Sequence, residues 1–413
     1  MDKVFNKPTV KGEIYAVASK SEAHRALICA ALADGATRVE CHETNDDIDS
    51  TVSCLCALGA KIHRDASGFF VQPINRVNGG AALECNESGS TLRFLLPVAS
   101  ALGADCSFYM RGRLPQRPLS PLYELLSDNG ISLGKMGQSP LCISGKLSAG
   151  NYSIAANVSS QYISGLLMAL SICQGTSTLA LTGNIESAPY IDMTVDALTH
   201  FGASIEFNTD NNTFYIDGKN RLTSPTVASV GGDWSGGAFF LCAGAIGKSS
   251  VTVRGLDVGS RQGDKKILSV LEAMGARTEV GDGTITVYPS KIHGTNIDAA
   301  QIPDLVPILA TVASVAEGKT VIYNASRLRL KESDRIQSTC DFLARLGANI
   351  APTDDGMIIS GKSALVGGVV DSFGDHRIAM SAAIASLACT KKVTVRGFEA
   401  TAKSYPSFAE NFN

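Results

Sequence analysis

A dense run of charge lies at residues 327–336, which read RLRLKESDRI and place six ionisable groups in ten positions of a chain that is only 18% charged. Charge runs are often only solvated surface. If this run is helical, however, Lys331 and Arg335 lie one turn apart, and such a like-charge pair costs about 0.2–0.5 kcal/mol. We therefore expect an anion beside them. Glu332 and Asp334 can supply it in an internal ion-pair network, but two more arginines in the run favour an external phosphate or carboxylate.

Hydroxyls and further cations lie at the predicted starts of six Ala-rich helices. These starts read SKSEAHRAL, NESGSTLRF, VSSQYISGL, GGDWSGGAF, IPDLVPIL and FGDHRIAM. Ser or Asp is favoured as an N-cap by about 1 kcal/mol. This preference is enough to explain the Ser or Asp at any one of these helix starts. Several of these helix starts also carry a cationic or an amide side chain. In the first of them, Arg25 lies one turn after Ser21. Helix N-termini equipped in this way bind phosphates and carboxylates.

A repeat of about 72 residues organises the elements that must position these groups. Phrases such as CALGAKI and HFGASIEF end amphipathic stretches at glycines spaced by 71, 72, 73 and 72 residues. A glycine at such a place suits the left-handed C-cap of a helix. A second motif recurs with the same spacing and lies between an Ala-rich helix and a strand rich in β-branched residues. The chain of 413 residues therefore holds about six α+β repeats. The glycines are Gly59, Gly130, Gly202, Gly275 and Gly347.

Length and composition restrict the class of protein. A chain of 413 residues exceeds a single core and predicts two domains. The net charge of −3 provides no polycation for nucleic acid. Eleven cysteines without CxxC pairs argue against a disulfide framework or a thiolate metal site. The chain shows no apolar signal region and no apolar run of membrane-spanning length, so we expect a cytoplasmic protein that binds neither membranes nor metal.

Nine motifs follow one another in the order found in the 5-enolpyruvylshikimate-3-phosphate synthases. They are KSEAHR, ESGSTLRF, RPL, SSQYISGLL, SAPYIDMT, IPDLVPILA, LRLKESDRI, GDHRIAM and AKSYPSF. The chain resembles this family of enolpyruvyl transferases over nearly its whole length, and KESDRI with GDHRIAM is the most specific part. The resemblance implies a mixed α/β (α+β) fold of two lobes. Each lobe would hold three βαβαββ repeats in an inside-out, pseudo-threefold arrangement, with the helix N-termini facing the cleft.

The same resemblance assigns a role to each lobe. The first, residues 14–229, would mainly bind shikimate 3-phosphate. The second, residues 1–13 with 230–413, would carry much of the phosphoenolpyruvate site. The implied activity transfers the enolpyruvyl group of phosphoenolpyruvate to the 5-hydroxyl of shikimate 3-phosphate and releases phosphate. It proceeds by addition and elimination through a tetrahedral intermediate and belongs to chorismate and aromatic amino-acid biosynthesis.

This chemistry needs a base for the hydroxyl, an acid for the methylene carbon and positive charge at the phosphate. The resemblance suggests Asp304 as the base, with Glu332 and Lys20 as proton-transfer groups. No cofactor and no further partner are expected, and the protein is expected to be a monomer. The implied shikimate 3-phosphate ligands are Lys20, Ser21, Arg25, Ser159, Ser160, Gln161, Ser187, Tyr190, Asp304 and Lys331. The implied phosphoenolpyruvate ligands are Lys20, Gly89, Arg117, Gln161, Arg335, Arg377 and Lys403.

One stretch departs from the usual family pattern. Residues 87–94 read ESGSTLRF where NAGTAMRP is frequent, so Glu87 and Phe94 replace Asn and Pro. This departure puts the detailed contacts at Gly89 in doubt, together with any inference about inhibitors that mimic phosphoenolpyruvate.

Other functions remain open at this stage. A UDP-N-acetylglucosamine enolpyruvyl transferase shares the fold and the donor, but commonly has Cys where this chain has Gly112. A non-catalytic binder of phosphorylated metabolites needs only the helix starts and arginines, and it would have no use for Asp304 and Glu332. A nucleotide-using kinase lacks support, because no GxxxxGK[ST] loop occurs.

Overall fold

The computed structural model describes residues 1–413 and divides them into two compact units. Unit 1 comprises residues 1–17 and 231–413, and unit 2 comprises residues 18–230. Residues 14–17, which the predicted boundary placed in the first lobe, belong to unit 1, because strand β2 (Glu13–Tyr15) pairs in parallel with β15 (Val251–Arg254). Val230 belongs to unit 2.

The second repeat of unit 2 shows how each repeat is built. Its elements follow in the order βαβαββ, and its four strands lie in the sheet order β6-β7-β9-β8. The first two strands are parallel, and the last two join by antiparallel pairing. The elements are β6 (Ala81–Asn86), α3 (Gly89–Leu102), β7 (Cys106–Met110), the 3-10 turn η1 (Leu114–Gln116), α4 (Leu122–Asp128), β8 (Ser132–Leu133) and β9 (Leu141–Ser144).

The flanking repeats of unit 2 have the same sheet topology. The first repeat takes its parallel edge strand, β14 (Val227–Ser229), from the far end of the unit. Its other elements are α1 (Lys20–Ala31), β3 (Thr37–Glu40), α2 (Asp46–Leu58), β4 (Lys61–Asp65) and β5 (Gly68–Gln72). The third repeat consists of β10 (Asn151–Ala155), α5 (Ser160–Leu170), β11 (Gly175–Thr182), α6 (Ala188–His200), β12 (Ser204–Asn208) and β13 (Thr213–Gly218).

Unit 1 contains two complete repeats and one that is modified. The first adds α7 (Trp234–Ile246), η2 (Gly263–Lys266), α8 (Ile267–Ala273), β16 (Arg277–Gly281) and β17 (Thr284–Tyr288) to β2 and β15. The second consists of β18 (Asn296–Asp298), η3 (Pro303–Leu305), α9 (Val306–Ala313), β19 (Lys319–Tyr323), η4 (Ser326–Leu330), α10 (Arg335–Arg345), β20 (Asn349–Pro352) and β21 (Met357–Ser360).

The sixth repeat departs from the pattern. Its sheet has three strands, because β1 (Lys3–Phe5) pairs antiparallel with β23 and takes the place of the last two strands of the other repeats. Short 3-10 turns follow where a second α-helix would stand. Its elements are β22 (Gly368–Asp371), α11 (His376–Ala385), η5 (Ser386–Ala388), β23 (Val393–Arg396), η6 (Phe398–Lys403) and η7 (Phe408–Asn411).

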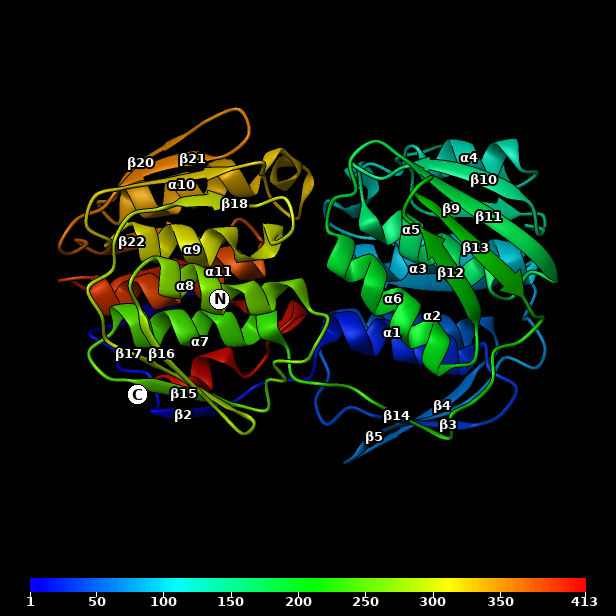
Figure 1. Cartoon of the computed structure of the whole chain (residues 1–413), viewed down its shortest axis with the longest axis horizontal. Helices are drawn as coiled ribbons and strands as arrows, with labels where there is room; N and C mark the ends of the chain where they lie inside the picture. Colours follow the sequence, from blue (N-terminus) through cyan, green and yellow to red (C-terminus); the bar gives the residue numbers. More distant parts are fainter. The chain divides into compact units, whose positions relative to one another are not determined.

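Helices fill the interior of each unit, while the sheets lie toward its outside (Figure 1). The sequence explains this inversion, because α3, α5, α7, α9 and α11 are apolar on nearly every face and are buried along almost their whole length. Each unit has its own hydrophobic core. None of the helices is both long and apolar enough to cross a bilayer.

The predicted helix ends are confirmed at both termini. The five glycines of the repeat all have positive φ and follow the second helix of their repeats. Five of the six Ala-rich helices begin with a side-chain N-cap, from Ser19, Ser88, Ser159, Asp233 and Asp375. The sixth, α9, is entered through the 3-10 turn η3 instead.

Candidate active site

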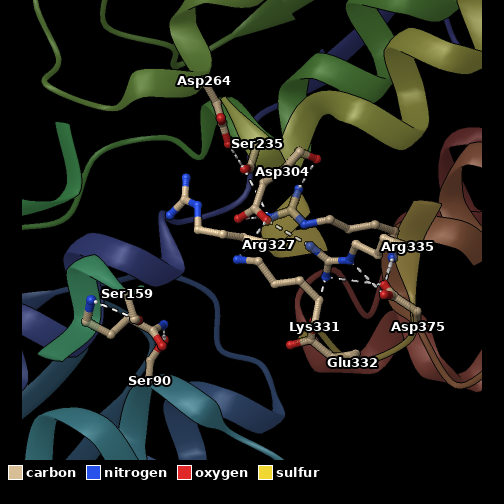
Figure 2. Close-up of polar contacts among 12 residues, drawn as sticks. Ser90, Ser159, Ser235, Asp264, Asp304, Arg327, Lys331, Glu332, Arg335 and Asp375 are labelled. Carbon is tan, nitrogen blue, oxygen red and sulfur yellow. Dashed lines mark hydrogen bonds and ion pairs between the residues drawn. The ribbon is translucent and has the colours of Figure 1, made fainter. Parts of the chain in front are cut away.

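Asp304 lies at the centre of a cluster of cations in unit 1 (Figure 2). Its Oδ1 atom lies 2.8 Å from Nη1 of Arg335 and 3.7 Å from Nζ of Lys331. Its Oδ2 atom lies 3.1 Å from Nη2 of Arg377, whose Nη1 also donates to the Asp304 backbone carbonyl. One carboxylate therefore holds three cations from two separate segments, residues 331–335 and residue 377.

The local structure explains why these groups meet. Asp304 belongs to η3, directly before α9, while Arg335 is the first residue of α10 and Arg377 is the second of α11. Three helix starts of unit 1 therefore present their polar residues to the same point. Helix N-termini favour anions, so the backbone adds positive potential around Asp304.

The run at 327–336 is not one helix, and the predicted helical pairing of Lys331 with Arg335 is wrong. The carboxylate of Asp334 caps α10 by accepting the N–H of Gln337, so the helix begins only at Arg335. Lys331 follows the 3-10 turn η4 and reaches Asp304 from outside the helix. The predicted anion beside both cations is therefore Asp304, which the spacing within the run does not reveal.

The internal ion-pair network, the alternative interpretation of this run, is also present. Arg335 Nη2 lies 2.7 Å from Oε2 of Glu332, and Arg335 Nε lies 2.7 Å from Oδ2 of the buried Asp375. Arg329 pairs with Asp334 at 2.9 Å and donates to two backbone carbonyls, so it ties η4 to the neighbouring loop. The ion pair of Lys331 with Asp304, at 3.7 Å, is longer than those of Arg329 and Arg335.

Burial and charge set the protonation states of the cluster. Burial alone favours the neutral acid of Asp304, but Arg377, Lys331 and Arg335 together hold its pKa well below the usual range of a carboxyl group. Burial lowers the pKa of Lys331 to about 8, although the charge of Asp304 partly opposes this. The pKa of Arg335 is raised, because its three carboxylate partners outweigh the cost of burial.

Glu332 and Lys403 extend the cluster. Lys403, at the end of η6, is only 6% exposed, and its Nζ lies 3.8 Å from Oε1 of Glu332. Glu332 therefore lies between two cations, Arg335 and Lys403. The predicted unit 1 residues Asp304, Lys331, Glu332, Arg335, Arg377 and Lys403 all lie in this one cluster.

The remaining predicted residues lie in unit 2, most of them at the starts of α1, α3, α5 and α6. Lys20, the first residue of α1, pairs with Asp47 of α2 at 2.8 Å. Arg25, one turn into α1, is only 2% exposed. It donates to the backbone carbonyls of Ser21 and Tyr190 and to the hydroxyl of Thr194, and so ties α1 to α6.

The start of α3 combines a missing side chain with two guanidinium groups. A Cβ atom at Gly89 would lie 2.9 Å from Nη1 of Arg117 and 3.1 Å from Nη1 of Arg93. The absence of a side chain therefore lets both guanidinium groups approach the free N–H groups of this helix end. Two cations and a helix N-terminus at one place favour an anion.

The start of α5 lies against the start of α3. Gln161 accepts a hydrogen bond from Nη1 of Arg93 at 2.9 Å, and its Nε2 donates to the hydroxyl of Ser90 at 2.8 Å. Its backbone N–H donates to the capping hydroxyl of Ser159. The next residue, Ser160, is the first of α5 and is buried. Gln161 is thus held in one orientation by groups from two helices.

The start of α6 carries backbone strain. Ser187 precedes this helix with φ 54° and ψ 39°, a left-handed conformation that is costly for a residue other than glycine. Its side chain does not cap the helix. Strained residues of this kind often serve a site, and the carbonyl of Tyr190, one turn on, accepts the Nη2 donor of Arg25.

Four acidic residues that support these clusters were not predicted as site residues. Asp47 binds Lys20, Asp375 binds Arg335, Asp334 caps α10, and Asp264 approaches Arg377 through Ser235. Asp375 and Asp334 each stand two or fewer positions before an arginine at a helix start, a pattern that can be read from sequence. The other two become evident only when distant segments are brought together.

Comparison with known proteins agrees with the motifs. The family model for EPSP synthase (3-phosphoshikimate 1-carboxyvinyltransferase) matches residues 5–412. A 3-phosphoshikimate 1-carboxyvinyltransferase of Clostridium novyi is 42% identical, covering 98% of this chain and 94% of the relative. A solved EPSP synthase of Acinetobacter baumannii superimposes with a TM-score of 0.81 at 27% identity, over 99% of this chain and 96% of that one. The enolpyruvyl transferase NikO of Streptomyces tendae, at 20% identity and a TM-score of 0.77 over 99% and 96% of the two chains, shows a similar fold.

Proposed function

The chain belongs to the EPSP synthase family, and from this premise we propose which of its residues carry the transfer of the enolpyruvyl group from phosphoenolpyruvate to shikimate 3-phosphate. Asp304 is the base that takes the proton of the 5-hydroxyl. Glu332 and Lys20 are the groups that move protons at the methylene carbon. The reaction passes through a tetrahedral adduct that then loses phosphate.

The position of Asp304 among Lys331, Arg335 and Arg377 is the observation that supports this proposal. A carboxylate whose pKa is held low by three cations is a weak base. The substrates bring their own phosphate and carboxylate groups, which compete for the same cations. As these anions bind, the pKa of Asp304 rises toward its usual range, so the base becomes stronger when there is a hydroxyl to deprotonate.

Glu332 can act as an acid only after substrate anions have engaged its cationic partners in the same way. Its contacts with Arg335 at 2.7 Å and Lys403 at 3.8 Å favour the carboxylate form. Substrate anions that engage these two cations would let Glu332 hold a proton for the methylene carbon. Lys20 is the second candidate, and its contact with Asp47 keeps the ammonium in a fixed position.

The ligands of each substrate are assigned as the family resemblance implies, and each set draws on residues of both units. Shikimate 3-phosphate is assigned to the starts of α1, α5 and α6, with Asp304 and Lys331 from unit 1. Phosphoenolpyruvate is assigned to the starts of α3, α10 and α11, together with the side chains of Lys20, Arg117, Gln161 and Lys403. Several guanidinium groups suit this pair, because each can bind an oxyanion through two parallel hydrogen bonds. The monomeric state and the cytoplasmic location remain predictions.

The Asp304→Asn variant tests the assignment of the base. Phosphate release from phosphoenolpyruvate with shikimate 3-phosphate should fall about 10²–10⁴-fold, the usual contribution of a general base. Binding of shikimate 3-phosphate, measured by calorimetry, should stay within about threefold or tighten, since a negative charge has been removed from an anion site. Asp298→Asn is the matched control, because this exposed aspartate lies in the preceding strand and bonds only to Asn324 and Ala300.

Two results would contradict the proposal. Turnover of the Asp304→Asn variant within threefold of the unmodified protein would remove Asp304 as the base. Phosphate release with UDP-N-acetylglucosamine in place of shikimate 3-phosphate would contradict the assigned acceptor.

A further inference from the structure

A buried carboxylate, that of Asp264, is linked to Arg377 through the hydroxyl of Ser235. Asp264 of η2 is 2% exposed, and its Oδ2 atom accepts a short hydrogen bond from the hydroxyl of Ser235. The same hydroxyl oxygen lies 3.1 Å from Nη2 of Arg377, and this nitrogen lies 3.1 Å from Oδ2 of Asp304. Figure 2 shows Ser235 between the carboxylates of Asp264 and Asp304.

The chemistry of the three groups determines which atom donates in each bond. A guanidinium group has only donors, so the oxygen of Ser235 must accept from Arg377. The single proton of the hydroxyl is then directed to Asp264, which must accept it. Asp264 therefore polarises the hydroxyl, and the hydroxyl in turn attracts the guanidinium. The result is a continuous chain of bonds from Asp264 through Ser235 and Arg377 to Asp304.

We propose that Asp264 is a positioning residue, which acts through the hydroxyl of Ser235 to hold the guanidinium of Arg377 in the orientation that binds phosphoenolpyruvate and contacts Asp304. This inference rests on the proposed roles of Arg377 and Asp304. It extends them by assigning a function to two residues, in η2 and α7, that lie outside the assigned ligand sets.

Helix capping does not account for the burial of Asp264. The start of α7 is already capped by Asp233, whose Oδ2 accepts the N–H of Gly236 at 3.0 Å. The N–H of Trp234, the first residue of α7, donates to Oε1 of Gln262 at 2.9 Å. Gln262 also donates to the carbonyl of Gly232, so it fastens the same loop to the helix start. A purely structural anchor therefore exists two residues before Asp264.

The charges that face Asp264 come from three other segments. Burial, followed by the negative charge of Asp304, raises its pKa to about 6, while Arg377 and the hydroxyl of Ser235 oppose this shift and Asp233 adds to it. Its own segment adds Arg261, Lys265 and Lys266. A proton on Asp264 can occupy the oxygen that now accepts from Ser235, which would turn the hydroxyl and weaken its hold on Arg377. The chain of bonds should therefore loosen below about pH 6.

Steady-state kinetics of the full chain can test the proposal. In the Asp264→Asn variant a neutral amide replaces the charged acceptor. The KM for phosphoenolpyruvate should rise about 5- to 20-fold, because a charge-assisted bond is about twice as strong as a neutral one. The KM for shikimate 3-phosphate should change less than twofold. In the unmodified protein, kcat/KM for phosphoenolpyruvate should decrease below about pH 6. In the Asp264→Asn variant, this decrease should be absent.

The Ser235→Ala variant interrupts the chain while leaving Asp264 in place. The double variant of Ser235 and Asp264 should be no worse than Ser235→Ala alone, since both changes act on one path. Ser235→Ala also keeps the proposal testable if Asp264→Asn does not fold. Gln262→Ala is the structural control: it should lower the melting temperature without changing either KM or the pH profile.

The outcomes separate this inference from the proposed function. If Asp304→Asn loses turnover while Asp264→Asn keeps the KM and pH profile of the unmodified protein, the positioning role of Asp264 is refuted and the base is retained. Effects of Asp264→Asn and Ser235→Ala that add independently would also refute it. If Asp304→Asn turns over normally, the proposed function itself fails, whatever Asp264 does.

Discussion

His24 should make unit 2 sensitive to mild acid. This histidine lies on α1, is fully buried, and bonds through Nδ1 to the hydroxyl of Thr51 at 2.7 Å. Burial lowers its pKa to about 3, and the charges of Lys20 and Arg25 add to this effect while Asp47 opposes it. In the unfolded chain the same group titrates near its ordinary value of about 6.5.

The sign of the effect follows from proton binding. Between pH 6.5 and pH 3 the unfolded chain binds a proton at His24 that the folded protein does not, so the stability contributed by this residue is complete above pH 6.5 and falls as the pH decreases. At 1.36 kcal/mol per pKa unit, a drop from pH 7.5 to pH 5 removes about 2 kcal/mol from the free energy of unfolding.

Urea unfolding at pH 7.5, 6 and 5 measures this loss. Far-ultraviolet circular dichroism must be followed, because the single tryptophan, Trp234, lies in unit 1 and does not report on His24 directly. His24→Asn should be less stable at pH 7.5, and its deficit relative to the unmodified protein should shrink by about 2 kcal/mol at pH 5. His42→Asn, at an exposed site, should keep a constant difference. A deficit for His24→Asn that does not change with pH would refute the reasoning.

Three further predictions follow from single contacts. In Arg335→Lys, one ammonium group cannot reproduce the bonds that Nη1, Nη2 and Nε of Arg335 make to three carboxylates, of which Asp375 is fully buried. The change should lower the free energy of unfolding, measured by urea unfolding, by about 3–5 kcal/mol and remove most of the turnover. Unchanged stability would contradict the ion-pair network. Affinity for shikimate 3-phosphate, followed by calorimetry, should weaken about fivefold between pH 8 and pH 9 as Lys331 loses its proton, and this loss should be absent in Lys331→Arg. Gly165→Ala should lower the free energy of unfolding by about 1–3 kcal/mol, because the added Cβ would lie 2.8 Å from Cγ of Pro97 and even closer to the carbonyl oxygen of Arg93. A melting temperature equal to that of the unmodified protein would show that α3 and α5 can separate freely.

Local signals in the sequence were sufficient to predict the repeat and its helix ends. The five glycines recur because each second helix ends in a backbone conformation that glycine adopts without strain. The Ser and Asp residues at the helix starts were predicted as N-caps and act as such in five helices. Both signals depend on bonds within a few residues, so they do not need the tertiary fold.

Strand exchange could not be predicted from the local pattern. β1 and β2 complete sheets of unit 1 whose other strands lie more than 200 residues away, and β14 closes the first sheet of unit 2. A short strand such as Glu13–Tyr15 carries too few side chains to specify its partner. Only the family resemblance indicated that the N-terminal strand joins the second lobe.

The site was predictable where its residues lie at helix starts and not where they are held by a distant carboxylate. Lys331 and Arg335 were correctly identified as cations that need an anion, but their spacing suggested a shared helix face, whereas Asp304 joins them from another segment. Arg25 was expected to bind a ligand, and its donors to three groups within unit 2 show how firmly it is already held. Its role as a ligand remains a prediction.

The balance of charge around Asp304 has a consequence for catalysis that neither the sequence nor any single contact reveals. Arg335 is held by Asp304, Glu332 and Asp375, so the cations of unit 1 are largely neutralised by the protein's own acids. Substrate anions must therefore displace carboxylates rather than fill a purely positive site. Each displaced carboxylate regains basicity as its cation is taken. Under the proposed roles of Asp304 and Glu332, binding energy from the phosphate and carboxylate groups of the substrates is in this way converted into the reactivity of these two side chains.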